Sequence, residues 1–268
     1  MVTIDYLLTT VGKTQQELRN IVSELNIKGR VLIGNQGFES DSIINDIVHG
    51  CKITIFNMTG FGVSKNRNKL LSEASSEYVT FLDDDMYFQD EMQLNVEKTL
   101  ESHRYNAVRF NVVSDNINRP IKLLTKQGYV GFRQLSSFGV CGIFYKRDFL
   151  KENNINFNEK IGPGTDINHG EDGLFNNTFL KHSKIYCFPQ IAFHAKQIES
   201  TWHGKNRNLE KELISHGYIY YLLYGKTAQL MSIIFLMTHM RCFHKGTKFS
   251  ALWKYMRLGI KKAKEELK

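Results

Sequence analysis

Three consecutive carboxylates, Asp83, Asp84 and Asp85, directly follow the apolar segment Tyr78–Leu82. Neighbouring carboxylates repel one another, so the triplet predicts either a solvated turn or a site for a cation. Because side chains alternate in an extended chain, Asp83 and Asp85 are expected on one side and Asp84 on the other. Two carboxylates at this spacing can hold a hard divalent ion, Mn²⁺ or Mg²⁺, and leave positions for water and phosphate oxygens.

A second acidic pair, Glu171 and Asp172, follows the glycine-rich segment KIGPGTDINHG and precedes apolar residues at helical spacing. A carboxylate at the start of a helix can act as a general base that takes the proton of an incoming hydroxyl. Acids are also favoured at helix N-termini for structural reasons, because they complement the helix dipole. The spacing alone leaves both interpretations open.

Alternating elements in the first hundred residues place the aspartates at a strand end. The apolar pattern predicts strands over residues 3–9, 30–33, 52–56 and 78–82, and helices up to residue 25, over 43–48 and over 63–74. This alternation is typical of βαβ units in an α/β fold with a mostly parallel sheet. Ligands of such sheets bind beyond the carboxyl ends of the strands, which is where the aspartates follow.

The second half of the chain continues the pattern and then becomes helical. It predicts a helix over residues 91–102, strands over 107–112, 138–145, 185–188 and 191–193, and a helix from Glu171. Residues 195–268 are expected to be helical, with a 13-residue apolar run at 228–240. A bilayer span needs about 20 apolar residues, so this run predicts either a helix that caps the core or one that lies on an anionic membrane surface.

Composition and charge narrow the class of protein. The chain has 268 residues with 42% hydrophobic and 23% charged side chains, which is typical of a globular protein. A formal charge of +8 favours an anionic partner such as a phosphate-bearing ligand, a membrane surface or nucleic acid. The acidic clusters in mid-chain argue against a nucleic-acid partner. Four cysteines without a C-x-x-C pair, and no recognisable signal peptide, favour reduced thiols and a cytoplasmic location.

Three longer segments carry a resemblance to a known family. GVSKNRN, followed by a helix, a strand and the aspartates, resembles the G-x-S-x-x-R-N helix and D-x-D of the family 2 glycosyltransferases. FNEKIGPGTDINHGEDGLF resembles that family's acceptor loop, and PQIAFHAKQIESTW resembles its closing strand with a histidine and a Ser/Thr-Trp segment. Together the motifs span most of residues 2–203 in the family's order.

The resemblance implies a fold, a domain organisation and an activity. It implies a GT-A catalytic domain, with a Rossmann-like core, over residues 1–195, in which 1–105 bind the nucleotide sugar and 106–195 the acceptor. Residues 196–268 would form a helical extension. The implied enzyme is a metal-dependent, inverting glycosyltransferase at the inner face of the membrane. It would move a sugar from a nucleotide-sugar donor, with UDP favoured over dTDP or GDP, to a glycan or lipid-linked oligosaccharide in surface polysaccharide synthesis.

The resemblance also implies roles at the acidic clusters. Asp172 matches the family's general base, with Glu171 as the alternative or as a group that binds acceptor hydroxyls. Asp83 would contact the ribose or metal region of the donor, and Asp85 would coordinate Mn²⁺ or Mg²⁺ that bridges the diphosphate. His194 lies where family members place a third metal ligand or a diphosphate contact.

The remaining implied contacts are with the donor. Gly62, Arg67 and Asp84 belong to motifs that line the donor site, and Arg67 would meet the phosphates or brace the aspartates. The strand ends depart from the family pattern, since Thr9 and Asn35 stand where other residues are usual. Both can still bond the edge of a base.

Two other function classes remain open at the level of sequence. A phosphoryl transferase or nuclease would use aspartates to hold two metal ions, although the chain has no P-loop motif. A non-catalytic nucleotide-sugar-binding module would bind the donor without transfer. The oligomeric state is not predicted.

Overall fold

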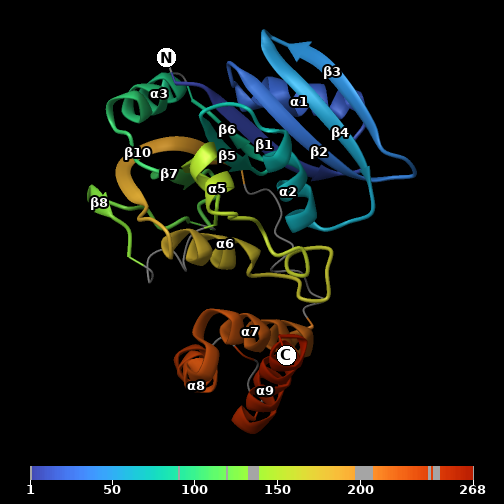
Figure 1. Ribbon diagram of the computed structural model, residues 1–268, viewed down its shortest axis with the longest axis vertical. Coiled ribbons are helices and arrows are strands. Elements are labelled where there is room, and N and C mark those ends of the chain that lie inside the picture. Colours follow the sequence, from blue (N-terminus) through green and yellow to red (C-terminus); the bar gives the residue numbers. More distant parts are fainter. Residues whose placement is uncertain are drawn as a thin grey trace.

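A ten-stranded sheet with helices on both faces forms the main part of the computed structural model, which describes residues 2–89, 91–118, 120–131, 139–196, 208–240, 243 and 248–267 (Figure 1). The strands are β1 (Ile4–Val11), β2 (Arg30–Phe38), β3 (Ser42–Val48), β4 (Cys51–Thr59), β5 (Tyr78–Leu82), β6 (Met86–Tyr87), β7 (Ala107–Ser114), β8 (Gly128–Tyr129), β9 (Ile143–Lys146) and β10 (Tyr186–Ala195). The helices are α1 (Gln15–Leu25), α2 (Val63–Glu73), α3 (Met92–Ser102), α5 (Arg147–Glu152), α6 (Glu171–Leu180), α7 (Leu209–Tyr224), the short 3₁₀ helix η1 (Gly225–Thr227), α8 (Ala228–His239) and α9 (Phe249–Glu266). The predicted α/β class with C-terminal helices is confirmed.

Two buried clusters, one on each face, make the sheet a three-layer structure. Helices α1 and α3 contribute to the cluster on one face, and α2, α5 and α6 contribute to the cluster on the other. Strand β5 is buried along its whole length, as expected for a strand covered on both faces. Strands β1, β2, β4 and β5 are parallel neighbours in the order β4-β2-β1-β5. Their carboxyl ends therefore meet at one edge of the sheet.

Residues 43–48 form the edge strand β3, so the helix predicted there is wrong. Strand β3 pairs antiparallel with β4 through a tight turn in which His49 and Gly50 both have positive φ (48° and 81°). Two such central residues are the requirement of a type I′ hairpin turn. The isoleucines fit either period over so short a segment, and their β-branched side chains favour a strand. Ile43 and Ile47 lie on the exposed face, each 63% exposed.

The second half of the sheet is mixed, whereas the predicted parallel arrangement is seen for β4, β2, β1 and β5. Strand β9 is antiparallel to both of its neighbours, β5 and β7, whereas β10 is parallel to β7. The two short strands predicted near residues 185–193 form the single strand β10, with shifts in its register on either side of Ile191. A run of buried apolar residues indicates burial on both faces but not strand direction, so the sequence pattern could not distinguish these arrangements.

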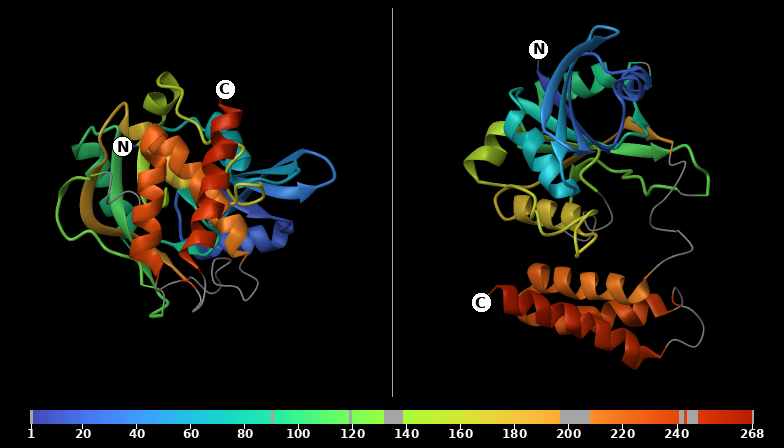
Figure 2. Two further views of the ribbon diagram at one scale, coloured as in Figure 1. Left: turned by 90° about the horizontal axis from the view of Figure 1, so that it is seen from below. Right: turned by 90° about the vertical axis from the view of Figure 1, so that its right-hand side faces the viewer.

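The helices α7, α8 and α9, here called the C-terminal helices, form a separate layer beyond α6 (Figures 1 and 2). Backbones of α7 and α9 touch, because a Cβ added at Gly217 would lie 2.0 Å from the carbonyl oxygen of Met256. Within the described chain, Leu209–His239 is long and apolar enough to cross a membrane by length and composition, and 22% of its apolar window is buried. In the structure this stretch is interrupted at Gly225, where α7 ends and the chain turns into α8.

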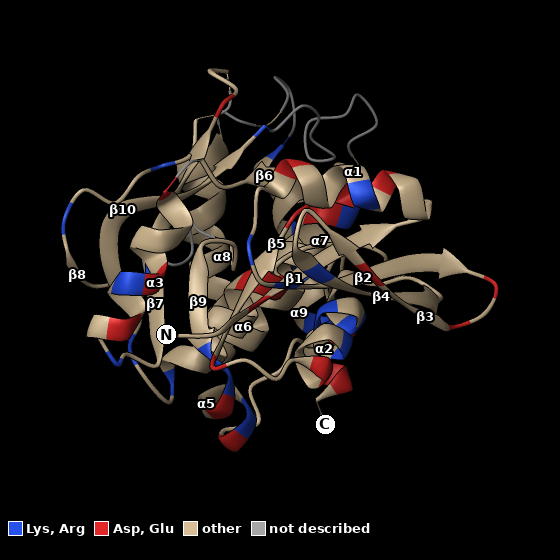
Figure 3. Ribbon diagram, turned by 90° about the horizontal axis from the view of Figure 1, so that it is seen from above, with Lys and Arg blue, Asp and Glu red and all other residues tan. Residues whose placement is uncertain are grey.

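Charged residues are interspersed rather than gathered on the side of the sheet seen from above. Figure 3 shows Lys, Arg, Asp and Glu mixed over the helices and strands on that side. Among the described cysteines, Cys51, Cys141 and Cys187 carry free thiols.

Candidate active site

Arg67, on the buried face of α2, brings together three of the predicted carboxylates. Its guanidinium lies 2.5 Å from Asp172 Oδ1, 3.6 Å from Glu171 Oε1 and 3.7 Å from Asp83 Oδ1. Its side chain is only 5% exposed and stacks over the ring of Phe157 at 5.3 Å. Burial by itself lowers the pKa of a guanidinium, but Asp172 and Asp83 raise the pKa of Arg67 above its ordinary value. The cation therefore persists and holds the carboxylates together.

The other polar residues of the GVSKNRN segment clamp the loop that precedes α6. Ser64 donates a hydrogen bond to the carbonyl oxygen of Ile161 at 2.5 Å. The Asn68 amide donates to the carbonyl oxygen of Phe157 at 2.9 Å and accepts from its N–H at 2.8 Å. These side chains satisfy loop backbone groups that would otherwise be buried without partners. The motif thus fixes residues 157–161 against the helix that carries Arg67.

Gly62 allows a glycine-rich turn to approach the start of α2. It has φ of 130° and precedes Val63, whose N–H donates to the carbonyl oxygen of Pro163 at 3.0 Å. A Cβ added at Gly164 would lie 2.9 Å from the Gly62 nitrogen. Glycine is therefore required at this contact for steric reasons.

A cavity of about 290 Å³ lies between the ends of β1 and β2, the start of α2 and this turn. Its lining residues are Thr9, Thr10, Val11, Gln36, Phe61, Gly62, Val63, Asn66, Pro163 and Gly164. Phe61 is 63% exposed, so its ring is free to stack on a planar ligand. Phe61 was not among the predicted site residues, although an aromatic residue directly before the motif glycine is a usable signal.

Asn35 makes its hydrogen bonds within the protein. Its side chain is fully buried, and its amide donates to the carbonyl oxygen of Lys13 at 2.7 Å and to Asn57 Oδ1 at 3.1 Å. Its Oδ1 accepts from the Lys13 N–H at 3.0 Å. Both donors of the Asn35 amide are therefore used within the protein. Asn35 holds the turn after β1.

Asp83 is the open member of the Arg67 cluster. Its side chain is 57% exposed, and it also accepts a hydrogen bond from the Cys141 thiol at 3.6 Å. Protein surrounds the Asp83 carboxylate closely enough that lost hydration raises its pKa. The negative charges of Asp172 and Asp85 also raise this pKa, and the Arg67 cation acts in the opposite direction. Cys141 was not among the predicted site residues, since only the pairing of residue 141 beside Phe81 brings it to this strand end.

The next two aspartates point to different partners. Asp84 Oδ2 accepts a hydrogen bond from Thr10 Oγ1 at 3.1 Å, toward the cavity beside β1. The backbone carbonyl of Asp85 accepts from the Lys196 N–H at 3.0 Å, which joins this turn to the end of β10. The three acids therefore do not form one solvated turn with equivalent surroundings.

His194 lies in β10 opposite Tyr87, at the same edge of the sheet. Its Nδ1 is 2.8 Å from Asp115 Oδ1, and its Nε2 is buried without a hydrogen-bond partner among the described residues. Partial burial raises the pKa of the Asp115 carboxyl, but hydrogen bonds from His194 and Tyr87 outweigh this effect and lower the pKa below its ordinary value. A histidine oriented in this way by a carboxylate is typical of metal sites.

The described residues do not hold an assembled metal site. No three His, Cys, Asp or Glu side chains lie close enough together in the described ranges to form one. The carboxylates of Asp83 and Asp85 and the unpartnered nitrogen of His194 are nevertheless donors that Mn²⁺ and Mg²⁺ accept.

Glu171 and Asp172 open α6 as predicted, directly after Gly170 in the left-handed conformation. Asp172 is 25% exposed, and its Oδ2 accepts from the Val140 N–H at 3.2 Å. Glu171 is 11% exposed. Burial and the neighbouring Asp172 raise the pKa of Glu171 to about 7, against the lowering effect of Arg67. Of the pair, Asp172 is the more open to an incoming hydroxyl.

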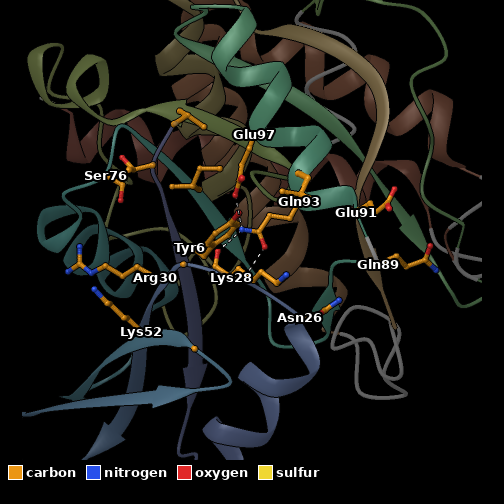
Figure 4. Close-up of a pocket in the computed structure, with 16 residues that line it drawn as sticks. Tyr6, Asn26, Lys28, Arg30, Lys52, Ser76, Gln89, Glu91, Gln93 and Glu97 are labelled. Atoms are coloured by element: carbon orange, nitrogen blue, oxygen red, sulfur yellow. Dashed lines mark hydrogen bonds between the residues drawn. The ribbon is translucent and has the colours of Figure 1, made fainter.

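A larger cavity of about 780 Å³ lies at the opposite edge of the sheet (Figure 4). It is lined by the amino ends of β1 and β2 and by α3, with Tyr6, Lys28, Arg30 and Glu97 among its residues. The predicted site residues are absent from its lining. The Ser/Thr-Trp segment around Trp202 and the start of the segment from Phe138 lie outside the described residues.

Comparison with known proteins agrees with this geometry. The family model described as glycosyl transferase family 2 matches residues 30–165. The chain resembles crystal structures of TarS from S. aureus. It matches TarS 1–349 in complex with UDP-GlcNAc with a TM-score of 0.63 and 16% identity, over 95% of this chain and 79% of that one.

Two further TarS structures are similar. TarS 1–349 in complex with UDP gives a TM-score of 0.60 at 16% identity, over 92% of this chain and 76% of that one. A longer TarS chain gives a TM-score of 0.60 at 16% identity, over 92% of this chain and 46% of that one. At such identities the likeness shows a shared fold. No curated protein sequence matches the chain.

Proposed function

The chain belongs to glycosyl transferase family 2, and on this basis we propose an inverting enzyme in which Asp172 is the general base. The observation that carries the proposal is the Arg67 cluster, which joins the aspartate after β5 to the acidic pair of α6. Donor-side and acceptor-side carboxylates thereby share one cation.

In the proposed reaction, Asp172 accepts the proton of an acceptor hydroxyl. The hydroxyl oxygen forms the new bond to the anomeric carbon as the bond to the nucleoside diphosphate breaks on the opposite face. Arg67 holds the Asp172 carboxylate in place through its 2.5 Å contact. Glu171, whose pKa is about 7, binds a second acceptor hydroxyl.

Asp83, Asp85 and His194 are the residues that would hold Mn²⁺ or Mg²⁺. When bound there, such an ion stabilises the negative charge of the leaving diphosphate. The buried Nε2 of His194, which has no hydrogen-bond partner within the described part of the chain, supports this assignment. Asp84, which accepts a hydrogen bond from Thr10, orders the turn between the metal-binding residues and the cavity beside β1.

The proposed donor is a UDP-sugar held in the cavity of Thr9, Phe61 and Gly62. Solved structures of TarS, which has a similar fold, contain UDP-GlcNAc and UDP, and this supports the choice of nucleotide. Phe61 supplies an exposed ring for the base.

The proposed acceptor is a glycan or lipid-linked oligosaccharide of surface polysaccharide, reached from the cytoplasmic face of the membrane. Leu230, Ile234 and Met237 recur at helical spacing on α8 and are 58%, 44% and 67% exposed. Such a stripe can contact the interface of a bilayer. It supports a peripheral membrane contact through the C-terminal helices.

A panel of nucleotide sugars with Mn²⁺ tests the proposal. The full chain should release UDP from at least one UDP-sugar, and an acceptor should accelerate the release. Binding of UDP without release from any sugar would indicate a binding module. Cleavage of a phosphodiester without sugar transfer would indicate a phosphoryl transferase or nuclease.

A further inference from the structure

The amino end of α6, which carries Glu171 and Asp172, has no side-chain cap of its own. Its N-cap residue is Gly170, with φ of 93°, which has no side chain that could cap the first turn. A glycine cannot restrain the chain by packing a side chain of its own. What fixes the two carboxylates must therefore come largely from other elements.

Polar side chains of α7 contact the residues directly before α6. His216 Nδ1 and His169 Nε2 lie 3.2 Å apart and share a hydrogen bond. The adjacent Ser215, which is 1% exposed, donates to Asn168 Oδ1 at 3.4 Å. Asn168 Oδ1 also lies 3.0 Å from His169 Nδ1. Consecutive residues of α7 thus bond to consecutive residues of the turn.

Ile219, one turn further along α7, packs onto the N-cap glycine itself. A Cβ added at Gly170 would lie 2.3 Å from Ile219 Cδ1, so the isoleucine fills the space directly over this backbone. The contact belongs to a buried cluster that links the loop before α6 to the C-terminal helices. The cluster consists of Ile161, Ile167, Tyr218, Ile219 and Ala263.

Helix α7 is well suited to act as a fixed support. Its backbone touches α9, where a Cβ added at Gly259 would lie 1.9 Å from the carbonyl oxygen of Ile214. The donor side of the same loop is held separately, since Ser64 and Val63 of α2 bond Ile161 and Pro163. The backbone of Ile161 and Pro163 is thus bonded to α2, and residues 168–170 contact α7.

We propose that α7 positions the catalytic carboxylates, with His216 and Ile219 as positioning residues for Glu171 and Asp172. The catalytic part of this inference rests on the proposed function. A base that moves by about 1 Å can cost about 100-fold in rate, so loss of the α7 contacts should impair transfer. The donor cavity is clamped by α2 and should be little affected.

Steady-state kinetics of the His216→Ala and Ile219→Ala variants of the full chain test this proposal. The control is the Leu236→Ala variant. Leu236 is fully buried between the C-terminal helices, in a cluster with Leu213, Leu252 and Met256. His216→Ala and Ile219→Ala should each lower kcat by about 10-fold or more while KM for the donor stays within about twofold. Leu236→Ala should lower the melting temperature but leave kcat within about twofold. Ile219→Val, the milder change, should restore most of kcat.

Equal losses of kcat in all three alanine variants, or unchanged kcat in His216→Ala and Ile219→Ala, would overturn the proposal. Amide hydrogen exchange decides it independently of activity. Exchange over residues 168–177 should be faster in Ile219→Ala than in Leu236→Ala under conditions where both remain folded. Equal exchange rates over residues 168–177 in the two variants would show that α7 does not position the start of α6. If the wild-type chain transfers no sugar, the proposed function is wrong. The exchange measurement still tests whether α7 positions the start of α6.

Discussion

The two acidic segments of the site are held in opposite ways. The aspartates after β5 face solvent, with Asp83 57% exposed and 3.7 Å from Arg67. The acidic pair of α6 is enclosed, with Asp172 25% and Glu171 11% exposed. Asp172 also uses both oxygens for contacts with Arg67 and Val140. The difference indicates that the protein preorganises the second segment, whereas the first segment is open to a ligand such as the proposed metal ion.

The strongest way to break this comparison is to remove the base. Asp172→Asn keeps the shape of the side chain but cannot accept a proton. We expect kcat for transfer to fall by about 1,000-fold, because general-base catalysis contributes about 100- to 10,000-fold. Binding of UDP, measured by calorimetry, should stay within about threefold. A variant that loses UDP binding and transfer in parallel would place Asp172 on the donor side instead.

The enclosure of Glu171 predicts a pH-dependent stability. Burial raises its pKa from 4.5 to about 7 in the folded chain. Between about pH 4.5 and pH 7 the unfolded chain releases the proton and the folded chain retains it, so stability falls as pH rises through this range. Above about pH 7 the penalty is complete and amounts to about 3 kcal/mol.

The variant Glu171→Gln removes this titration. Its free energy of unfolding relative to wild type should rise by about 3 kcal/mol between pH 4.5 and pH 8, as measured by urea denaturation. Wild type and variant with parallel pH profiles would show that the glutamate is not held in a low-dielectric site.

The open segment should respond to a metal ion. Asp85→Asn should lower kcat by about 100-fold, which corresponds to about 2.7 kcal/mol, and should weaken UDP binding in Mn²⁺ but not in its absence. Asp84→Asn is the matched control, because Asp84 is bonded to Thr10. Similar losses of Mn²⁺-dependent binding in both variants would argue against a specific ion site at Asp85.

The smallest expected effect lies outside both acidic segments. Phe61→Ala removes the exposed ring beside the cavity, and stacking of a base on an aromatic ring contributes about 1–3 kcal/mol. KM for the donor should rise about 10-fold while kcat for transfer changes little. An unchanged KM for the donor would show that the base of the nucleotide does not stack on Phe61.

Sequence patterns predicted the elements that carry the site better than the contacts between them. Buried strands such as β5 and the helix from Glu171 were found because apolar residues recur at the period of the element. Residues 43–48 were assigned to a helix because four apolar residues fit two periods over so short a segment. Strand direction around β9 was not predictable, since burial on both faces gives the same pattern in either direction.

The site shows the same division between local and distant information. The aspartates, Arg67 and Asp172 were predicted from local motifs. The internal bonds of Asn35, the approach of Cys141 to Asp83, and the contact of α7 with the turn before α6 join segments far apart in the chain. Composition and spacing carry no information about such distant pairs, and only the folded chain reveals them.

A crystal of the protein soaked with Mn²⁺ and UDP tests the central claim most directly. The account predicts an anomalous Mn²⁺ peak among Asp83, Asp85 and His194, with the diphosphate beside it and Asp172 still in contact with Arg67. An ion bound at the acidic pair of α6, or UDP in the cavity at the amino ends of the strands, would contradict it.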